Sequence, residues 1–125
     1  MTPPIAQIVA GSAAIKAVIG SAPVRFWSFG EAERDADGNV AAPYAVWQTV
    51  YGNPENYLAQ VPDADRWGTQ VDAYARSMTQ ARALAALLRD AFEPYAYIVA
   101  WNGEFKDTPT GLYRVSFTLE WLTPR

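Results

Sequence analysis

The chain has 125 residues, no cysteine and no histidine, and a formal net charge of −3 at pH 7. This length fits a single domain, expected over residues 1–125, that buries roughly two-thirds of its unfolded surface. The missing cysteines exclude disulfides and thiolate metal sites, and the missing histidines exclude catalytic triads that depend on an imidazole base. Arginines and lysines are scattered among thirteen carboxylates, unlike the basic stripe of a nucleic-acid-binding protein.

The N-terminal segment predicts two short helices. Residues 4–10 and 12–19 carry apolar side chains at helical spacing, with a pivot at Gly11 and a stop at Gly20. The segment is too short to span a bilayer, Lys16 interrupts it, and no basic region precedes it. We therefore expect no secretory signal and a chain that is made in the cytoplasm.

Two strands and two long connections are predicted next. Residues 24–30 are strand-like and aromatic, and residues 44–51 carry bulky side chains on both faces, which suits a central strand covered on both sides. Residues 31–42 form a polar loop or the tip of a long hairpin, with an Asp-Gly turn signal. Residues 52–66 form the second connection.

The hydrophobic period changes once, in the middle of the chain. Residues 67–74 alternate between two faces, as in a strand, whereas the apolar residues from Met78 to Phe92 recur at three and four. Ser77 stands where an N-cap belongs, and the residue before Pro94 is disfavoured in helical conformation. We expect a strand that runs directly into a docked helix.

Two more strands are predicted in the last third of the chain. Residues 96–101 form one, and residues 112–122 alternate cleanly between apolar and polar faces. Turn signals at residues 102–103 and 108–111 separate them. The sum is an α+β fold: a mostly antiparallel sheet of about five strands, with one long helix and a helical N-terminus packed on one face.

One acidic segment begins like a calcium-binding loop. Asp35, Asp37 and Asn39 have the required spacing, but such a loop also needs glycine at its sixth position and glutamate at its twelfth. Here Gly38 is fourth and Val46 is twelfth. A solvated tip is therefore the better interpretation.

Two other features have structural interpretations. Asp63 and Asp65 stand beside Arg66 and could share acid–base work, but no second motif would hold a substrate, so a charged loop is preferred. The five Trp, seven Tyr and five Phe are first read as core residues, then as a partner surface, and last as a ligand pocket. No catalytic residue, metal ligand or cofactor is predicted.

A series of short motifs runs along nearly the whole chain. In order, they are a helical start ending near Gly20, Ala-Pro-Tyr-Ala-Val at 42–46, Asp-Ala-Asp-Arg at 63–66, a strand over 70–75, an alanine-rich helix over 78–92, and Thr-Gly-Leu-Tyr-Arg-Val at 110–115. In their order and spacing these motifs resemble the small tail-completion proteins of long-tailed bacteriophages, the family that includes siphophage tail terminators. The acidic segment 31–39 departs from the pattern, because it is long for a simple turn.

The resemblance implies an α+β structural protein and no enzyme. It implies a ring, usually hexameric, that caps the growing tail tube at the head-proximal end of the virion tail, after assembly in the host cytoplasm. The implied partners are further copies of the chain, the tail tube protein and the head-side connector or stopper, with neither nucleic acid as the main ligand nor a membrane. The alternatives are a head-completion or other neck connector protein and, from another class, a small-molecule-binding α+β domain.

Candidate interface residues lie mainly on the two long connections. A closing ring needs two different patches that meet, and loops on a rigid sheet commonly carry such contacts. We expect acidic residues of the connections to meet arginines on a neighbour or on the tube, and charge reversal at Asp63 and Asp65 to weaken ring formation. The candidates are Arg25, Asp35, Asp37, Asp63, Asp65, Arg66, Arg76 and Arg114.

Overall fold

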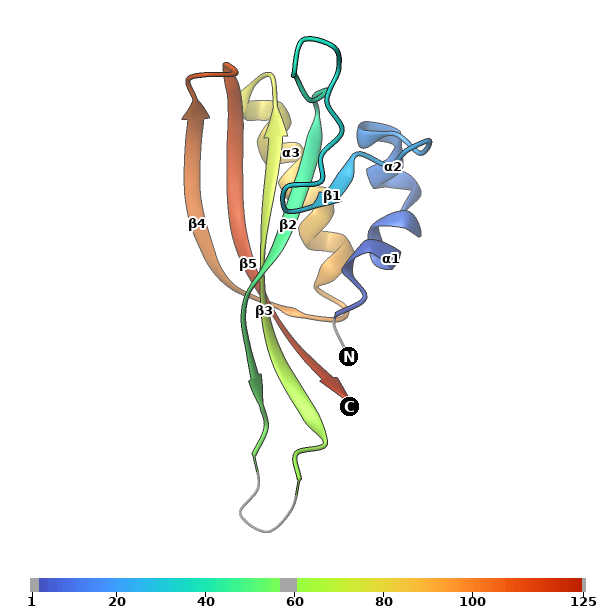
Figure 1. The fold of residues 1–125 in the computed structure, drawn as a ribbon, viewed down its shortest axis with the longest axis vertical. Helices are drawn as coiled ribbons and strands as arrows, with labels where there is room; N and C mark the ends of the chain where they lie inside the picture. Colours follow the sequence, from blue (N-terminus) through green and yellow to red (C-terminus); the bar gives the residue numbers. More distant parts are fainter. Residues whose placement is uncertain (1–2, 57–60, 125) are drawn as a thin grey trace.

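The computed structural model describes residues 3–56 and 61–124. In chain order its elements are α1 (Ile5–Ala10), α2 (Ala13–Ile19), β1 (Phe26–Ser28), β2 (Tyr44–Pro54), β3 (Ala64–Ala75), α3 (Met78–Phe92), β4 (Tyr97–Asp107) and β5 (Leu112–Pro124). The strands form one sheet in the order β1-β2-β3-β5-β4, in which β1 and β2 are parallel and the other pairs antiparallel. The helices lie on one face of the sheet (Figure 1), which confirms the predicted α+β fold.

Two of the three helices, α2 and α3, begin with a side-chain cap. The hydroxyl of Ser12 accepts a hydrogen bond from the amide of Ile15 at 3.3 Å, and the hydroxyl of Ser77 accepts one from the amide of Gln80 at 3.2 Å. Each bond satisfies an amide that the first helical turn leaves without a partner. The predicted helix from Met78 to Phe92 is confirmed at both ends.

The core lies between α3 and the sheet. The buried residues of α3 share one face of the helix: Ala81, Leu84, Ala85, Leu88 and Phe92. They pack on β3 and β5, and the ring of Phe92 lies 6.0 Å from Trp121 and 6.3 Å from Phe26 between ring centroids. The indole nitrogen of Trp121 donates to the hydroxyl of Thr69 at 2.9 Å, so this buried polar pair is satisfied.

The predicted strand 24–30 and the hairpin tip after it are corrected. Strand β1 covers three residues and runs parallel to β2. Parallel strands cannot be joined by a tight hairpin, so residues 31–42 form a connection between them. The Asp-Gly signal marks a local turn there, in which a carboxylate oxygen of Asp35 accepts hydrogen bonds from the amides of Asp37 and Asn39, both at 2.9 Å.

The predicted connection 52–66 is shorter than expected, and residues 57–60 of it lie outside the described residues. Strand β2 continues to Pro54 and β3 begins at Ala64, so most of the described connection is paired strand. A methyl group on Gly52 would lie 2.8 Å from the ring of Trp67, and one on Gly68 would lie 1.9 Å from the ring of Tyr51. The glycines thus leave room for aromatic rings across the ladder and do not end the strands.

The predicted break after Trp101 is also wrong. Strand β4 continues through Asn102 and Gly103 to Asp107, with a shift of register between Trp101 and Gly103. Gly103 takes a φ of 115° there, which favours glycine. The side-chain Nδ2 of Asn102 donates to the hydroxyls of Ser116 and Thr118 on β5, at 3.2 and 2.9 Å.

The molecule is elongated, with distinct ends and sides. The β2–β3 hairpin extends to the lower end in Figure 1, while the β1–β2 connection and the β4–β5 turn lie at the upper end. The edge strand β4 and the pair α1–α2 form opposite sides. Among the described residues, no helix combines the length and the apolar character that crossing a membrane requires.

Candidate interaction surfaces

A polar basin of about 960 Å³ opens at the upper end of the molecule, between the β1–β2 connection and the β4–β5 turn. Its floor is formed by the ends of β2 and β3, where the rings of Tyr44 and Tyr74 stack 4.7 Å apart at 10°. Burial, together with the nearby Tyr74 and Asp107, raises the pKa of Tyr44 to about 12. That hydroxyl therefore stays neutral near pH 7 and adds no negative charge to the basin.

Four cationic side chains line this basin: Arg34, Arg76, Lys106 and Arg114. Three of them are positioned by uncharged groups. Arg34 donates to the carbonyl of Gly38 at 2.8 Å, the guanidinium of Arg114 lies 4.5 Å from the ring centroid of Phe105, and the ammonium of Lys106 lies 5.4 Å from that of Tyr113. Arg76 is exposed between β3 and α3.

Two carboxylates line the same basin, Asp35 and Asp107. Both accept hydrogen bonds within turns: Asp35 from the two amides described above, and Asp107 from the hydroxyl of Thr110 at 2.5 Å. No ion pair joins either of them to a cation among the described residues. The basin therefore carries an excess of positive charge in a chain whose net charge is negative.

Arg25 belongs to the same end of the molecule but serves the fold. Its Nε donates to the carbonyl of Pro43 at 2.9 Å and its Nη2 to the carbonyl of Val18 at 3.3 Å. These bonds tie the end of α2 to the entrance of β2. Arg25 also lines a smaller hollow that it shares with Arg34 and Asp35.

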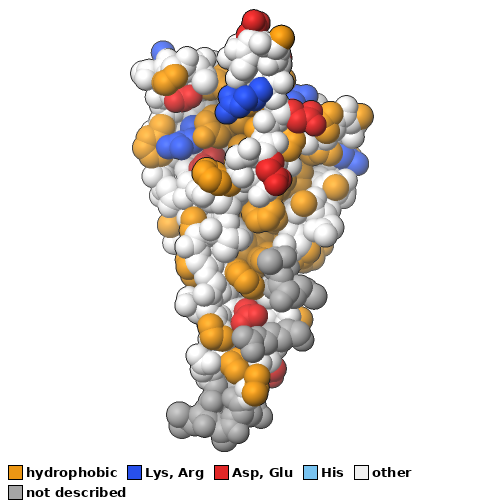
Figure 2. Space-filling view, in the orientation of Figure 1, with side chains coloured by type: hydrophobic (Ala, Val, Ile, Leu, Met, Phe, Trp, Pro, Cys, Tyr) orange, Lys and Arg blue, Asp and Glu red, His pale blue; other side chains and the backbone are white. Residues whose placement is uncertain are grey.

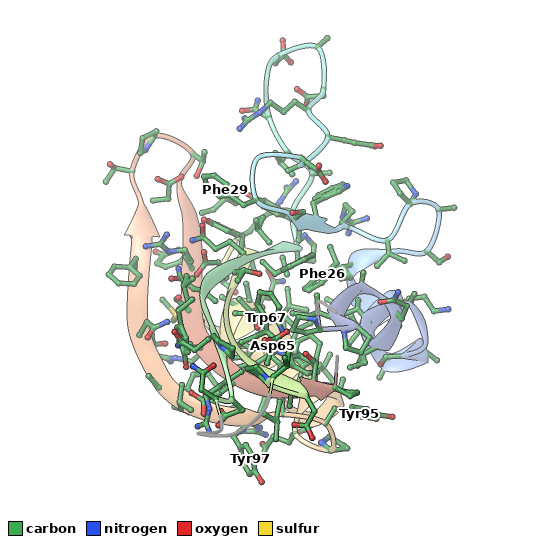
Figure 3. The ribbon with its side chains drawn as sticks, turned by 60° about the horizontal axis from the view of Figure 1, so that its bottom comes forward. Phe26, Phe29, Asp65, Trp67, Tyr95 and Tyr97 are labelled. Carbon is green, nitrogen blue, oxygen red and sulfur yellow. The ribbon has the colours of Figure 1, made fainter. Side chains whose placement is uncertain are left out.

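The predicted residues Asp63, Asp65 and Arg66 lie at the other end, at or beside the start of β3 in the β2–β3 hairpin. Figure 3 labels Asp65 there. Arg66 bridges Glu55 at 2.7 Å and Glu120 at 2.8 Å, and these carboxylates raise its pKa. The carboxylate of Glu120 also accepts a 2.5 Å hydrogen bond from the hydroxyl of Tyr51, which raises the pKa of that hydroxyl. Arg66 on β3 thus links the two arms of the β2–β3 hairpin to each other and to the neighbouring strand β5.

The structure therefore separates the predicted interface residues into two groups. Asp35, Asp37, Arg76 and Arg114 lie at the upper end with Arg25, and the remaining three lie at the lower end. The expectation that acidic connections and arginines form interfaces stays a prediction. Sequence reasoning missed Arg34 and Lys106, because their convergence depends on the connection folding back towards the β4–β5 turn.

The aromatic edge strand β4 was missed as well. Its exposed apolar side chains include Tyr97, Val99, Trp101 and Phe105, of which Tyr97 is 78% exposed. Tyr95 and Tyr97 extend outward at the lower edge of the view in Figure 3, whereas Phe26 and Trp67 lie within the fold. The run of aromatic and β-branched residues from Tyr95 to Trp101 was a usable signal, but residues 96–101 were predicted only as a further strand, without an exposed edge.

The opposite side of the molecule is formed by α1 and α2. Its exposed residues are mostly small and apolar: Ala6, Ala10, Ala13, Ala14, Ala17 and Val18. The two sides of the molecule thus differ: one exposes aromatic residues along an edge strand, and the other exposes mostly small apolar residues along two helices. Within the described part of the chain, no group of His, Cys, Asp or Glu side chains forms a metal site.

The comparisons with known proteins agree with this architecture. The family described as tail completion protein gp17 matches residues 3–124. A chain from a solved structure titled "Virion of native gene transfer agent (GTA) particle" superposes with a TM-score of 0.69, over 97% of this chain and 92% of that chain, at 11% sequence identity.

This second likeness supports the fold alone, because its sequence identity is low. No curated protein matches the chain. The family match spans nearly the whole chain and confirms the resemblance drawn from the ordered motifs. The chain therefore belongs to the tail completion protein gp17 family of bacteriophage structural proteins.

Proposed function

We propose that this tail completion protein is a tail terminator. In this proposal, copies of the chain form a ring that caps the tail tube, stops tube polymerisation and presents a surface to the head-side connector. The ring is expected to be hexameric, as the family resemblance implies. The observation that carries the proposal is the pair of unlike apolar sides, β4 on one side and α1–α2 on the other.

Unlike sides are what a ring of identical subunits requires. In a ring, one patch of each subunit meets a different patch of the next, whereas a two-fold dimer pairs a patch with itself. Exposed aromatic residues suit a contact with small side chains, since aromatic groups supply large contact areas and alanines permit close approach. The outer edge of β4 also presents backbone groups to which no described strand pairs.

The elongated shape supports the same arrangement. If neighbours meet along β4 and α1–α2, the two ends of each subunit face opposite ways along the ring axis (Figure 1). One end is then available to the tube and the other to the connector. This would explain why the candidate charged residues are divided between the ends of the molecule.

The test places like charges on one side of the subunit. Tyr97→Lys combined with Val99→Lys adds two charges to exposed positions of β4, and desolvating them in a contact is unfavourable. We expect a folded subunit that neither forms rings in negative-stain images nor stops the growth of purified tail tubes. Thr79→Lys with Ala83→Lys, on the exposed face of α3, adds the same charge and is expected to leave both intact.

A mixing experiment tests the unlike pairing itself. Ala13→Lys with Ala17→Lys damages the α2 side with the same sign of charge as the β4 variant, so the two altered sides repel each other and each variant retains the side that the other lacks. An equal mixture is expected to give dimers and no rings by native mass measurement. Rings formed by the β4 variant alone, or copurification of the unaltered protein with filled heads and not with tail tubes, would overturn the terminator proposal.

A further inference from the structure

The cationic basin at the upper end holds more positive than negative charge, because four cations and only two carboxylates, Asp35 and Asp107, line it. Three arginines form ion pairs within the described residues: Arg66 with Glu55 and Glu120, Arg82 with Glu104, and Arg89 with Asp90 and Glu93. None of these three lines the basin. The four cations that do line it have no carboxylate within ion-pair distance in the described ranges, although thirteen carboxylates are present in the chain.

The four cations come from separate parts of the chain and converge at one place. Arg34 lies on the β1–β2 connection, Arg76 follows β3, and Lys106 and Arg114 lie on the two arms of the β4–β5 hairpin. Figure 2 shows Lys and Arg side chains in the upper part of this face, over these elements. Like charges brought together repel one another, so their convergence indicates an anionic group that binds between them.

The structure also holds these side chains ready for a ligand. Arg34 is fixed by the carbonyl of Gly38, and Arg114 is spread over the face of Phe105. A guanidinium held in this way loses less conformational entropy when it binds a carboxylate, often through two parallel hydrogen bonds. Tyr44 and Tyr74 supply an aromatic floor for the aliphatic part of a ligand.

The surroundings favour a short anionic segment over a long one. The connection beside the basin exposes Glu31, Glu33 and Asp37, which would repel an extended polyanion such as nucleic acid. The basin, at about 960 Å³, is of the size that encloses a ligand of a few residues. A carboxylate-rich peptide meets the cations without having to continue past the acidic connection.

We propose that the basin binds a short acidic peptide segment of a different protein, one that adjoins this end of the subunit. That the partner is a protein of the virion rests on the proposed function, whereas binding of an acidic peptide does not. The ring contact tested above uses Tyr97 and Val99 near the start of β4, whereas Phe105 and Lys106 line the basin near the end of that strand, so the basin stays open when the ring has formed. It would then join the ring to its neighbour along the tail axis.

The probe is a fluorescein-labelled peptide of glutamates and glycines, titrated into the purified protein at low ionic strength and followed by fluorescence anisotropy. Arg76→Gln with Lys106→Gln is expected to weaken binding about tenfold or more, because it removes two of the four cations that would form charge-assisted hydrogen bonds with the carboxylates of the peptide. Arg82→Gln with Arg89→Gln removes the same charge from arginines that are already paired, and is expected to change binding by less than about twofold.

Three results would overturn the proposal. They are no saturable binding of the peptide, equal weakening by the two double variants, or tighter binding of an oligothymidine of equal charge through Arg76 and Lys106. Chemical-shift changes on peptide binding must map to the basin, including Tyr44 and Phe105.

The same variants separate this proposal from the terminator proposal. If the basin variant loses the peptide but still joins tails, the assignment of the partner to the virion is wrong. If the peptide binds normally but the unaltered protein caps no tubes, only the terminator proposal fails.

Discussion

At the residue scale, close packing around glycine organises the β2–β3 hairpin. The ring of Tyr51 lies directly over Gly68, where a methyl group would approach it to 1.9 Å. This placement lets the Tyr51 hydroxyl reach Glu120, which in turn holds Arg66. One glycine thus determines the geometry of a network that links three strands.

Gly68→Ala is therefore expected to destabilise the subunit. The added methyl group must push the Tyr51 ring aside, and overpacking of this kind costs about 1–3 kcal/mol. Urea denaturation should show a loss of that size in the free energy of unfolding. In a Tyr51→Ala background the same substitution should cost much less, because the clash is gone. Equal costs in both backgrounds would show that the ring contact is not the cause.

At the element scale, α3 is a structural support. Its buried face packs on β3 and β5, while its exposed positions include Arg82, which bonds the carboxylate of Glu104 on β4 at 2.5 Å and lowers the pKa of that carboxyl. The buried face of the helix therefore supports the centre of the sheet, while the exposed pair between Arg82 and Glu104 adds little to stability.

Leu84→Asp or Leu88→Asp is expected to unfold the subunit. Each leucine is almost completely buried, and a carboxylate placed there without a partner costs several kcal/mol, which is comparable to the stability of a small domain. Circular dichroism should show loss of the cooperative thermal transition. The control variant Ala83→Asp, on the exposed face of the same helix, should melt within a few degrees of the unaltered protein. If it also loses the cooperative transition, the cause is the low helix propensity of aspartate and not the burial of the leucines.

At the scale of the whole molecule, charge is divided between two ends. The upper end carries the cationic basin and the acidic β1–β2 connection, and the lower end carries Asp63 and Asp65 on the hairpin. A subunit that joins two different structures needs two such distinct ends. The proposed terminator function therefore predicts that each end recognises its own partner.

Charge reversal at the two ends should separate these partners. Asp63→Lys with Asp65→Lys is expected to weaken assembly at one junction, and Arg76→Glu with Lys106→Glu at the other, while both variants keep the circular dichroism of the folded subunit. Light scattering and pelleting with purified tail tubes, and separately with connectors, would measure this. Loss of the same partner by both variants would show that the ends are not used separately.

Some of the fold could be predicted because it depends on neighbours in sequence. The helix from Met78 to Phe92, its Ser77 cap and the alternation in β5 are local patterns, and the structure keeps them. The errors arose where long-range pairing overrode local signals. Asn102 and Gly103 read as a turn, but cross-strand bonds to Ser116 and Thr118 keep them within β4.

The sequence by itself determined the fold class, the buried face of α3 and the family, since periodicity, capping and the order of motifs are properties of the chain. Tertiary structure alone decided which charges neutralise one another. Arg66 meets Glu120 across 54 positions of the chain, whereas Arg34 and Lys106 converge without a carboxylate partner among the described residues. Electrostatic interactions depend on distance in space, so the cationic basin exists only once the fold has brought the β1–β2 connection, the end of β3 and the β4–β5 hairpin together.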